Sequence, residues 1–100
     1  MNLGVFSLEG RTAIVTGASG GLGKETALAF AEVGCDVAIA ARNLQALEVV
    51  AAAVEQKGRR CLAVQTDITQ AAEVQRLIDR TVEHFQRIDI LVNNAAIAVE

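Results

Sequence analysis

The sequence predicts an α/β fold built on a doubly wound parallel sheet. Short apolar runs alternate along the chain with longer segments whose apolar residues recur at helical spacing. The apolar runs are continuous, which is typical of strands covered on both faces. A glycine-rich turn directly follows the first run, at residues 16–23. Strands separated by helices pair in parallel through right-handed crossovers, so the expected order is β-α-β-α-β-α-β.

The first part of the chain is expected to hold two strands with one helix between them. The first strand covers Arg11 to Val15, and the helix after the glycine-rich turn runs to about Val33. Gly34 suits the position after this helix, where φ is often positive. The second strand is expected at Val37 to Ala40.

The second helix and third strand follow. Asn43 is a suitable N-cap for the helix, and Lys57-Gly58 is expected to end it, with a cation in the last turn and a glycine after it. The expected apolar face of this helix consists of Leu44, Leu47, Ala51 and Val54. The third strand is expected at Cys61 to Val64.

The last predicted elements are a third helix capped by Thr69 and a fourth strand at Ile88 to Val92. The expected apolar face of this helix consists of Val74, Leu77, Ile78, Val82 and Phe85. The natural sheet order is 3-2-1-4, with a switch point between strands one and four, and ligands bind outside the carboxyl ends of such strands. The segments expected to carry the site therefore begin at Thr16, Ala41, Gln65 and Asn93.

Composition excludes several classes of protein. The chain has 100 residues, of which 52% are hydrophobic, so it fits one domain with a real core. A net charge of -3 provides no general attraction to nucleic acid or to an anionic membrane. No apolar run approaches the roughly 20 residues that span a bilayer, and the first residues show no signal peptide. We therefore expect a cytoplasmic protein.

Few residues could ligate a metal ion. Cys35 and Cys61 are expected to be reduced thiols, although one bridge between them is conceivable, and no CxxC pair is present. His84 is the one histidine and is expected on the surface, near the end of the third helix. No metal site is predicted.

The glycine-rich turn reads TGASGGLG from Thr16 to Gly23. Glycines let the backbone turn tightly and approach a diphosphate closely, and a helix N-terminus directs N–H groups and positive dipole to the same place. Ser19 adds a hydroxyl donor. Thr26 stands where the third glycine of GxGxxG would be, and a purely structural turn could also use this sequence. The position between an apolar strand and a helix favours a phosphate site.

This turn resembles the TGxxxGxG motif of the short-chain dehydrogenase/reductase family. Three other segments lie in family order and spacing: the lead-in at 6–13, Asp67-Ile68 after the third strand, and ILVNNA at 90–95. The last of these resembles the family's NNAG strand end, with Ala96 replacing the glycine, so the turn there is expected to differ. The resemblance implies a Rossmann-type fold and an NAD(P)-dependent oxidoreductase that transfers hydride between its cofactor and an alcohol or carbonyl substrate.

The resemblance also implies which residues bind the cofactor. The diphosphate and adjoining ribose would be held by Gly17, Ser19, Gly21, Leu22 and Gly23. Asp67 would contact the adenine amino group, with Ile68 beside the ring, and Asp67 could also cap the next helix. Asn93 and Asn94 would line the nicotinamide-ribose side and tie the fourth strand to its neighbours.

The end of the second strand bears on the choice between NADP and NAD. Enzymes that use NAD carry an acidic residue there, which binds the hydroxyl groups of the adenosine ribose. Ala41 takes this position, and Arg42 follows with a guanidinium suited to a 2′-phosphate, unless it is a solvated surface charge. Asp36 lies at the wrong end of the strand to substitute. This favours NADP(H), with NAD as the alternative, since Gly20 stands where many NADP-using relatives carry a basic residue.

The family's catalytic residues have no counterpart in this sequence. Family chemistry uses a Ser, a Tyr and a Lys in a YxxxK arrangement, and the chain contains no Tyr. No catalytic residue is therefore assigned. We expect the chain to be the cofactor-binding half of one domain, whose intact form takes a small alcohol or ketone substrate and forms homo-oligomers. The alternatives are a non-catalytic nucleotide-binding half-domain and a truncated remnant.

One face of the predicted sheet is expected to be poorly covered. Two helices should lie on one face and only the third helix on the other, so much of the second face would be bare. The fourth strand would also be an open apolar edge. We predict that residues 1–100 alone are unstable or self-associate. A sharp cooperative melt of a monomer, independent of protein concentration, would contradict this prediction.

Overall fold

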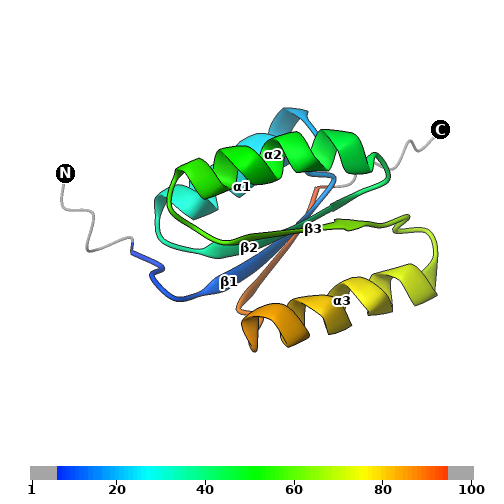
Figure 1. Ribbon diagram of the computed structural model, residues 1–100. Helices are drawn as coiled ribbons and strands as arrows, with labels where there is room; N and C mark the ends of the chain where they lie inside the picture. The colour runs from blue at the N-terminus through cyan, green and yellow to red at the C-terminus, as the bar shows by residue number, and fades with distance from the viewer. Residues whose placement is uncertain (1–6, 95–100) are drawn as a thin grey trace.

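The computed structural model describes residues 7–94 and places a parallel four-stranded sheet between two layers of helices (Figure 1). The elements are β1 (Thr12–Thr16), α1 (Gly21–Glu32), β2 (Asp36–Ala41), α2 (Leu44–Gln56), β3 (Cys61–Gln65), α3 (Ala71–Phe85) and β4 (Ile90–Asn93). The strand order is β3-β2-β1-β4, as predicted. Helices α1 and α2 cover one face and α3 covers the other (Figure 1). No helix within residues 7–94 is long and apolar enough to cross a membrane.

The strand boundaries differ slightly from the predicted ones. Strand β1 ends at Thr16, one residue later than predicted, because Thr16 still pairs with Ala40 of β2 and Asn93 of β4. Strand β4 begins at Ile90, because Ile88 lies in the preceding loop and packs against the core under α3. Polar residues therefore continue the hydrogen-bonded ladders past the apolar runs, toward the carboxyl edge.

The predicted helix ends are mostly confirmed. The Asn43 side chain accepts from the Ala46 amide at 3.1 Å and caps α2. Gly34 has φ +106°, as its predicted place after α1 requires. Thr69 does not cap α3, because its hydroxyl donates to the Asp67 carboxylate at 2.6 Å, a local bond that competes with capping.

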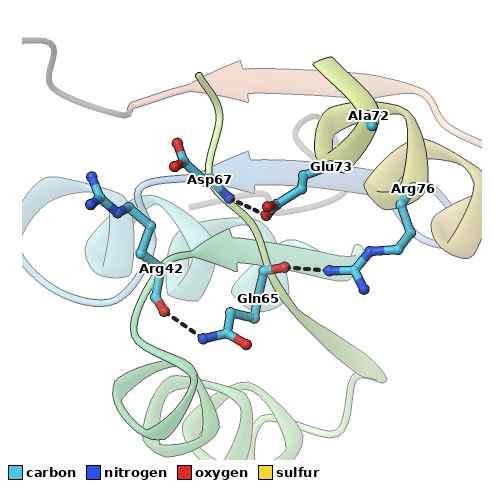
Figure 2. A pocket seen from close by; sticks show the side chains of 6 residues that line it. All are labelled: Arg42, Gln65, Asp67, Ala72, Glu73 and Arg76. Carbon is cyan, nitrogen blue, oxygen red and sulfur yellow. Dashed lines mark hydrogen bonds between the residues drawn. The ribbon is translucent and has the colours of Figure 1, made fainter. Parts of the chain in front are cut away.

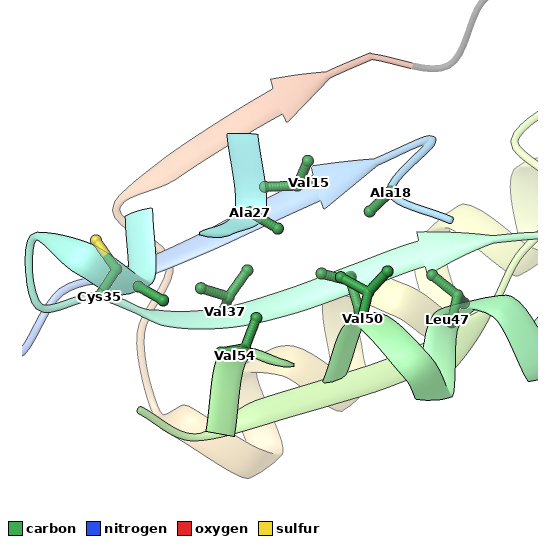
Figure 3. Close-up of a cluster of buried hydrophobic side chains, with 10 residues drawn as sticks. Val15, Ala18, Ala27, Cys35, Val37, Leu47, Val50 and Val54 are labelled. Atoms are coloured by element: carbon green, nitrogen blue, oxygen red, sulfur yellow. The ribbon is translucent and has the colours of Figure 1, made fainter. Parts of the chain in front are cut away.

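The larger part of the core lies between the sheet and the α1–α2 layer (Figure 3). Its buried members are Val15, Ala18, Ala27, Ala31, Cys35, Val37, Ile39, Leu47, Val50 and Val54. The predicted face of α2 was partly wrong: Val50 is buried, whereas Leu44 is 37% exposed at the first residue of the helix. The buried residues 47, 50 and 54 keep the helical repeat, on a face rotated slightly from the predicted one.

The α3 side of the sheet is less completely covered. Leu77 and Phe85 of α3 are buried against Ile14, Ala38, Ala40 and Val64 of the sheet. Val82, predicted on the apolar face of α3, is 46% exposed, and Leu91 of β4 is 64% exposed. The buried stripe of α3 instead includes Thr81, whose hydroxyl donates to the Leu77 carbonyl at 2.7 Å. The exposed Val82 and Leu91 match the predicted poor cover of this face, and self-association stays a prediction.

Asp89 ties the amino end of the sheet together, and it should make the free energy of unfolding vary with pH in the acidic range. It accepts from the Thr12 amide at 2.9 Å and from the Arg87 guanidinium at 2.7 Å. The Arg87 hydrogen bond, helped by the Thr12 amide, lowers the pKa of Asp89 from 3.8 to about 2. A carboxyl group whose pKa is lower in the folded than in the unfolded protein stabilises the fold at pH values above the unfolded pKa. The contribution of Asp89 is therefore lost as the pH falls from about 4 to about 2.

Urea unfolding across that pH range tests the role of Asp89. In Asp89→Asn the free energy of unfolding should be lower than wild type at neutral pH. It should also fall less steeply than in wild type as the pH is lowered through the range. Parallel pH curves for the two proteins would show that Asp89 is not the titrating group.

Candidate functional site

The predicted site residues within the described chain all lie at the carboxyl edge of the sheet. They form three groups: the turn between β1 and α1, the segments that follow β2 and β3, and the end of β4. The Ala18 amide donates to the Ala40 carbonyl at 3.2 Å, which ties the first group to the end of β2. The predicted change of turn at Ala96 lies outside the described residues.

The glycine turn closes tightly onto the start of α1. Gly17 and Gly21 have φ values of +63° and +55°, which favour glycine. A Cβ on Gly23 would lie 2.0 Å from the Gly17 carbonyl oxygen, so only glycine fits between turn and helix. The turn is thus packed directly against the first turn of α1.

The N-terminus of α1 is suited to an anion. Gly20 occupies the N-cap position, makes no side-chain capping bond, and no acidic residue lies in the first turn. The first N–H groups of a helix have no partner within the helix, and they carry the positive end of its dipole. The half-buried Ser19 precedes them, and Leu22 is 74% exposed beside them. These amides can hold a phosphate group.

A polar network joins β1, β4 and α1 beside the turn. The Thr16 hydroxyl donates to the Asn93 side-chain oxygen at 2.8 Å, and the Asn94 amide donates to Thr16 Oγ1 at 3.1 Å. The Asn94 side chain donates to Thr26 Oγ1 at 3.3 Å. The residue at the third-glycine position therefore has a use that the motif comparison missed: Thr26 anchors Asn94 to α1. Asn93 and Asn94 do tie β4 to its neighbours.

Arg42 and Asp67 line one cavity of about 570 Å³ beyond the ends of β2 and β3 (Figure 2). The other lining residues are Gln65, Ala72, Glu73 and Arg76. None of these four was given an individual role from the sequence, although one of the segments expected to carry the site begins at Gln65. The position of Gln65 at the end of an apolar run was a signal for it, whereas nothing local pointed to the α3 residues. The cavity has guanidinium, amide and carboxylate groups at its wall.

The Asp67 carboxylate is held in place and remains available to accept hydrogen bonds. Its Oδ1 accepts from the amide and hydroxyl of Thr69. The suggested helix cap is wrong, because α3 begins at Ala71, four residues after Asp67, and its N-cap residue is Gln70. The Asp67 amide donates to Glu73 Oε1 at 2.8 Å. Hydrogen bonds from Thr69, with help from the Arg42 charge, lower the pKa of Asp67. An ionised carboxylate can accept from an exocyclic amine.

Ile68 and its neighbour Asp67 line different cavities. This second cavity, of about 310 Å³, is mostly apolar and lies between α3, β1 and β4. Its lining residues are Ile14, Thr16, Ile68, Val74, Leu77, Ile78, Leu91 and Asn93. The structure thus brings Ile68 near Asn93 and places Asp67 with Arg42.

Other reactive side chains lie away from this edge. Cys35 and Cys61 are not joined, and burial raises the pKa of the Cys61 thiol to about 12, which keeps it protonated and unreactive. His84 is exposed in the last turn of α3, as expected, and its ring meets Phe85 edge-on at 4.7 Å. Asp36 lies at the amino end of β2, where Arg60 donates to it at 2.8 Å.

Comparison with known proteins adds independent evidence. Residues 11–100 match the family model described as short chain dehydrogenase. A short chain dehydrogenase/reductase of Aspergillus oryzae is 46% identical over 92% of this chain, and a 3-oxoacyl-[acyl-carrier-protein] reductase of Synechocystis is 45% identical over 91%. These alignments cover 36% and 37% of the two relatives, so the chain spans just over a third of their length.

Solved structures agree with the sequence comparisons. A hydroxysteroid dehydrogenase from Escherichia coli has a TM-score of 0.87 and 39% identity, with 90% of this chain and 38% of that one covered. A dehydrogenase/reductase from Sinorhizobium meliloti has a TM-score of 0.91 and 36% identity, with 95% and 38% covered. An NAD+-bound xylitol dehydrogenase has a TM-score of 0.86 and 38% identity, with 89% and 34% covered.

Proposed function

Because this chain belongs to the short-chain dehydrogenase family, whose members bind NAD(P), we propose that it forms the NADP(H)-binding part of an oxidoreductase. The observation that carries the proposal is the closed glycine turn at α1. Its backbone approaches the Gly23 position too closely for any Cβ, while the helix N-terminus carries no acidic side chain in its first turn. Both features fit a diphosphate.

We assign the diphosphate and adjoining ribose to the turn between β1 and α1. The residues proposed to hold them are Gly17, Ser19, Gly21, Leu22 and Gly23. Backbone amides would donate to the phosphate oxygens, since an anion at a helix N-terminus is stabilised by both the free N–H groups and the dipole. The exposed Leu22 would cover the bound group from the solvent side.

The adenosine end is proposed to occupy the cavity that Arg42 and Asp67 share. Asp67 would accept from the adenine amino group, and Arg42 would pair with a 2′-phosphate through its planar donors. Strand β2 ends at Ala41, so no carboxylate there repels that phosphate. Glu73, which also lines the cavity, is turned to the Asp67 amide. This arrangement supports NADP(H) over NAD.

The nicotinamide end is proposed to lie toward the end of β4. Asn93 and Asn94 stand at the switch point between β1 and β4, with Ile68 on the adjoining cavity. The bound cofactor supplies hydride transfer. The proposed contribution of these residues is to orient the cofactor beside β1, since contacts with the hydroxyls of Thr16 in β1 and Thr26 in α1 hold Asn94 in place.

The substrate of the whole protein is proposed to be a small alcohol or carbonyl compound. Relatives of this chain include a 3-oxoacyl-[acyl-carrier-protein] reductase and a 7alpha-hydroxysteroid dehydrogenase. The substrates that these two names indicate share a carbonyl or hydroxyl group at the reacting position but differ in the rest of the molecule. Residues 7–94 therefore support the reaction class through the cofactor and leave the substrate open.

Equilibrium titration of NADPH and NADH into the protein tests the proposal. We expect both to bind, with a dissociation constant for NADPH about tenfold or more below that for NADH, the effect of one charged hydrogen-bonded contact. Equal constants would contradict the preference for NADP(H). Failure of both nucleotides to bind would contradict the proposed function itself.

A further inference from the structure

We propose that Gln65 and Arg76 set the cofactor preference of this site by holding the backbone of Arg42 in place. Neither residue would touch the 2′-phosphate, so both are positioning residues. The inference rests on the proposed binding of NADP(H), and it concerns how the Arg42 guanidinium is presented to that cofactor.

The first step is the contact between Gln65 and Arg42. Ala41 and Gln65 form the last register pair of β2 and β3, and the Thr66 amide donates to the Ala41 carbonyl at 2.8 Å. Arg42 lies one residue beyond this ladder. The Gln65 side chain donates from Nε2 to the Arg42 carbonyl at 3.0 Å. A side chain therefore continues the pairing of the two strands by one residue, at the residue that carries the guanidinium.

The second step joins Gln65 to α3. Arg76 donates from Nη2 to the backbone carbonyl of Gln65 at 2.9 Å. In Figure 2 the two guanidinium groups lie on opposite sides of Gln65, with that of Arg76 directed at Gln65. Arg76 is thus placed to act through Gln65. The two hydrogen bonds form a relay from α3 through the end of β3 to the end of β2.

The relay should affect the binding of nucleotides that carry a 2′-phosphate and have little effect on nucleotides that lack it. The Arg42 side chain is exposed and otherwise free to sample many conformations, so a fixed backbone raises the share of molecules that present it to the cavity. The apparent dissociation constant of a ligand rises when the fraction of competent protein falls. Only a nucleotide with a 2′-phosphate uses Arg42. Breaking the relay should therefore weaken 2′-phosphorylated nucleotides selectively.

Binding of adenosine 2′,5′-bisphosphate and of 5′-AMP to the full protein tests the relay. Gln65→Met keeps the length of the side chain and removes its donor, at an exposed position where folding should be preserved. We expect its dissociation constant for the bisphosphate to rise about two- to tenfold, the effect of one neutral hydrogen bond. Gln65 also lines the cavity proposed for adenosine, so the constant for 5′-AMP should rise by a clearly smaller factor, and the ratio of the 5′-AMP constant to the bisphosphate constant should fall.

Variants of α3 provide the second arm and the control. Arg76→Met should repeat the selective loss, and Arg76→Lys should retain much of the wild-type preference because an ammonium can still donate to the Gln65 carbonyl. Arg80→Met removes the same charge one turn further along α3, at a residue outside this cavity, and should leave both constants unchanged. A loss in Arg80→Met equal to that in Arg76→Met would overturn the relay in favour of general charge.

The remaining outcomes separate the relay from the function on which it rests. If Arg42→Ala loses the preference for the bisphosphate while Gln65→Met and Arg76→Met keep it, the relay is overturned and the NADP(H) assignment stands. If Gln65→Met weakens both nucleotides equally, Gln65 supports the fold alone and the relay is overturned. If Arg42→Ala itself keeps the preference, the proposed role of Arg42 fails and the relay fails with it.

Discussion

Replacing Gly23 with alanine is expected to weaken cofactor binding strongly and to destabilise the protein. The added Cβ would lie 2.0 Å from the Gly17 carbonyl oxygen and 2.7 Å from its carbonyl carbon, and both atoms belong to backbone that cannot rotate away. The turn or α1 must shift to relieve this overlap. Overpacking of this kind costs about 1–3 kcal/mol of folding free energy, and it displaces the amides proposed to hold the diphosphate. We expect NADPH affinity to fall by about a hundredfold, close to 2.7 kcal/mol.

Gly20→Ala is the matched control for that change. A Cβ on Gly20 meets no atom within 4 Å, and the backbone there is extended, at φ -175°. Both variants add one methyl group to the same turn, and only Gly23→Ala should lose affinity in a titration with NADPH. Wild-type affinity in Gly23→Ala, or equal losses in the two variants, would show that the close contact between turn and helix does not form the binding site.

Replacing Arg42 with alanine is expected to remove the preference for NADP(H). A charged hydrogen-bonded contact contributes about 1.5–3 kcal/mol, so NADPH affinity should fall about ten- to a hundredfold. NADH affinity should change little, because Asp67 and the glycine turn are unaltered. Paired titrations of the two cofactors into wild type and Arg42→Ala measure this difference directly.

Arg42→Lys separates the charge from the shape of the side chain. Lysine retains the positive charge but lacks the planar fork that binds a phosphate through two hydrogen bonds. Its NADPH affinity should lie between those of wild type and Arg42→Ala. Equal losses for NADPH and NADH in Arg42→Ala would instead mean that Arg42 supports the loop and does not read the 2′-phosphate.

The fold could be predicted from the sequence because its signals are local. Continuous apolar runs such as that of β2 require cover on both faces, and helices between strands leave one common topology. Asn43 and Gly34 mark helix ends by side-chain and backbone chemistry of their own. The predicted face of α2 was less accurate, because the rotation of a helix against the sheet depends on packing that no single residue reveals.

The site was predictable only where residues follow a strand directly or belong to the glycine turn. Arg76 and Glu73 were missed because they reach the cavity from α3, and their place depends on how that helix lies against β3. Thr69 was misassigned because Asp67, two residues earlier, offers its hydroxyl a nearer acceptor. Thr26 was seen as a departure from a motif, whereas its contact with Asn94 exists only once β4 pairs with β1.

A structure of the protein with NADP(H) bound would test the central claim most directly. We predict the diphosphate within hydrogen-bond distance of the backbone amides between Gly17 and Gly23, with the 2′-phosphate against Arg42 and the adenine at Asp67. A nucleotide bound away from the carboxyl edge of the sheet would contradict the account. So would a 2′-phosphate directed into solvent, with no contact to the Arg42 guanidinium.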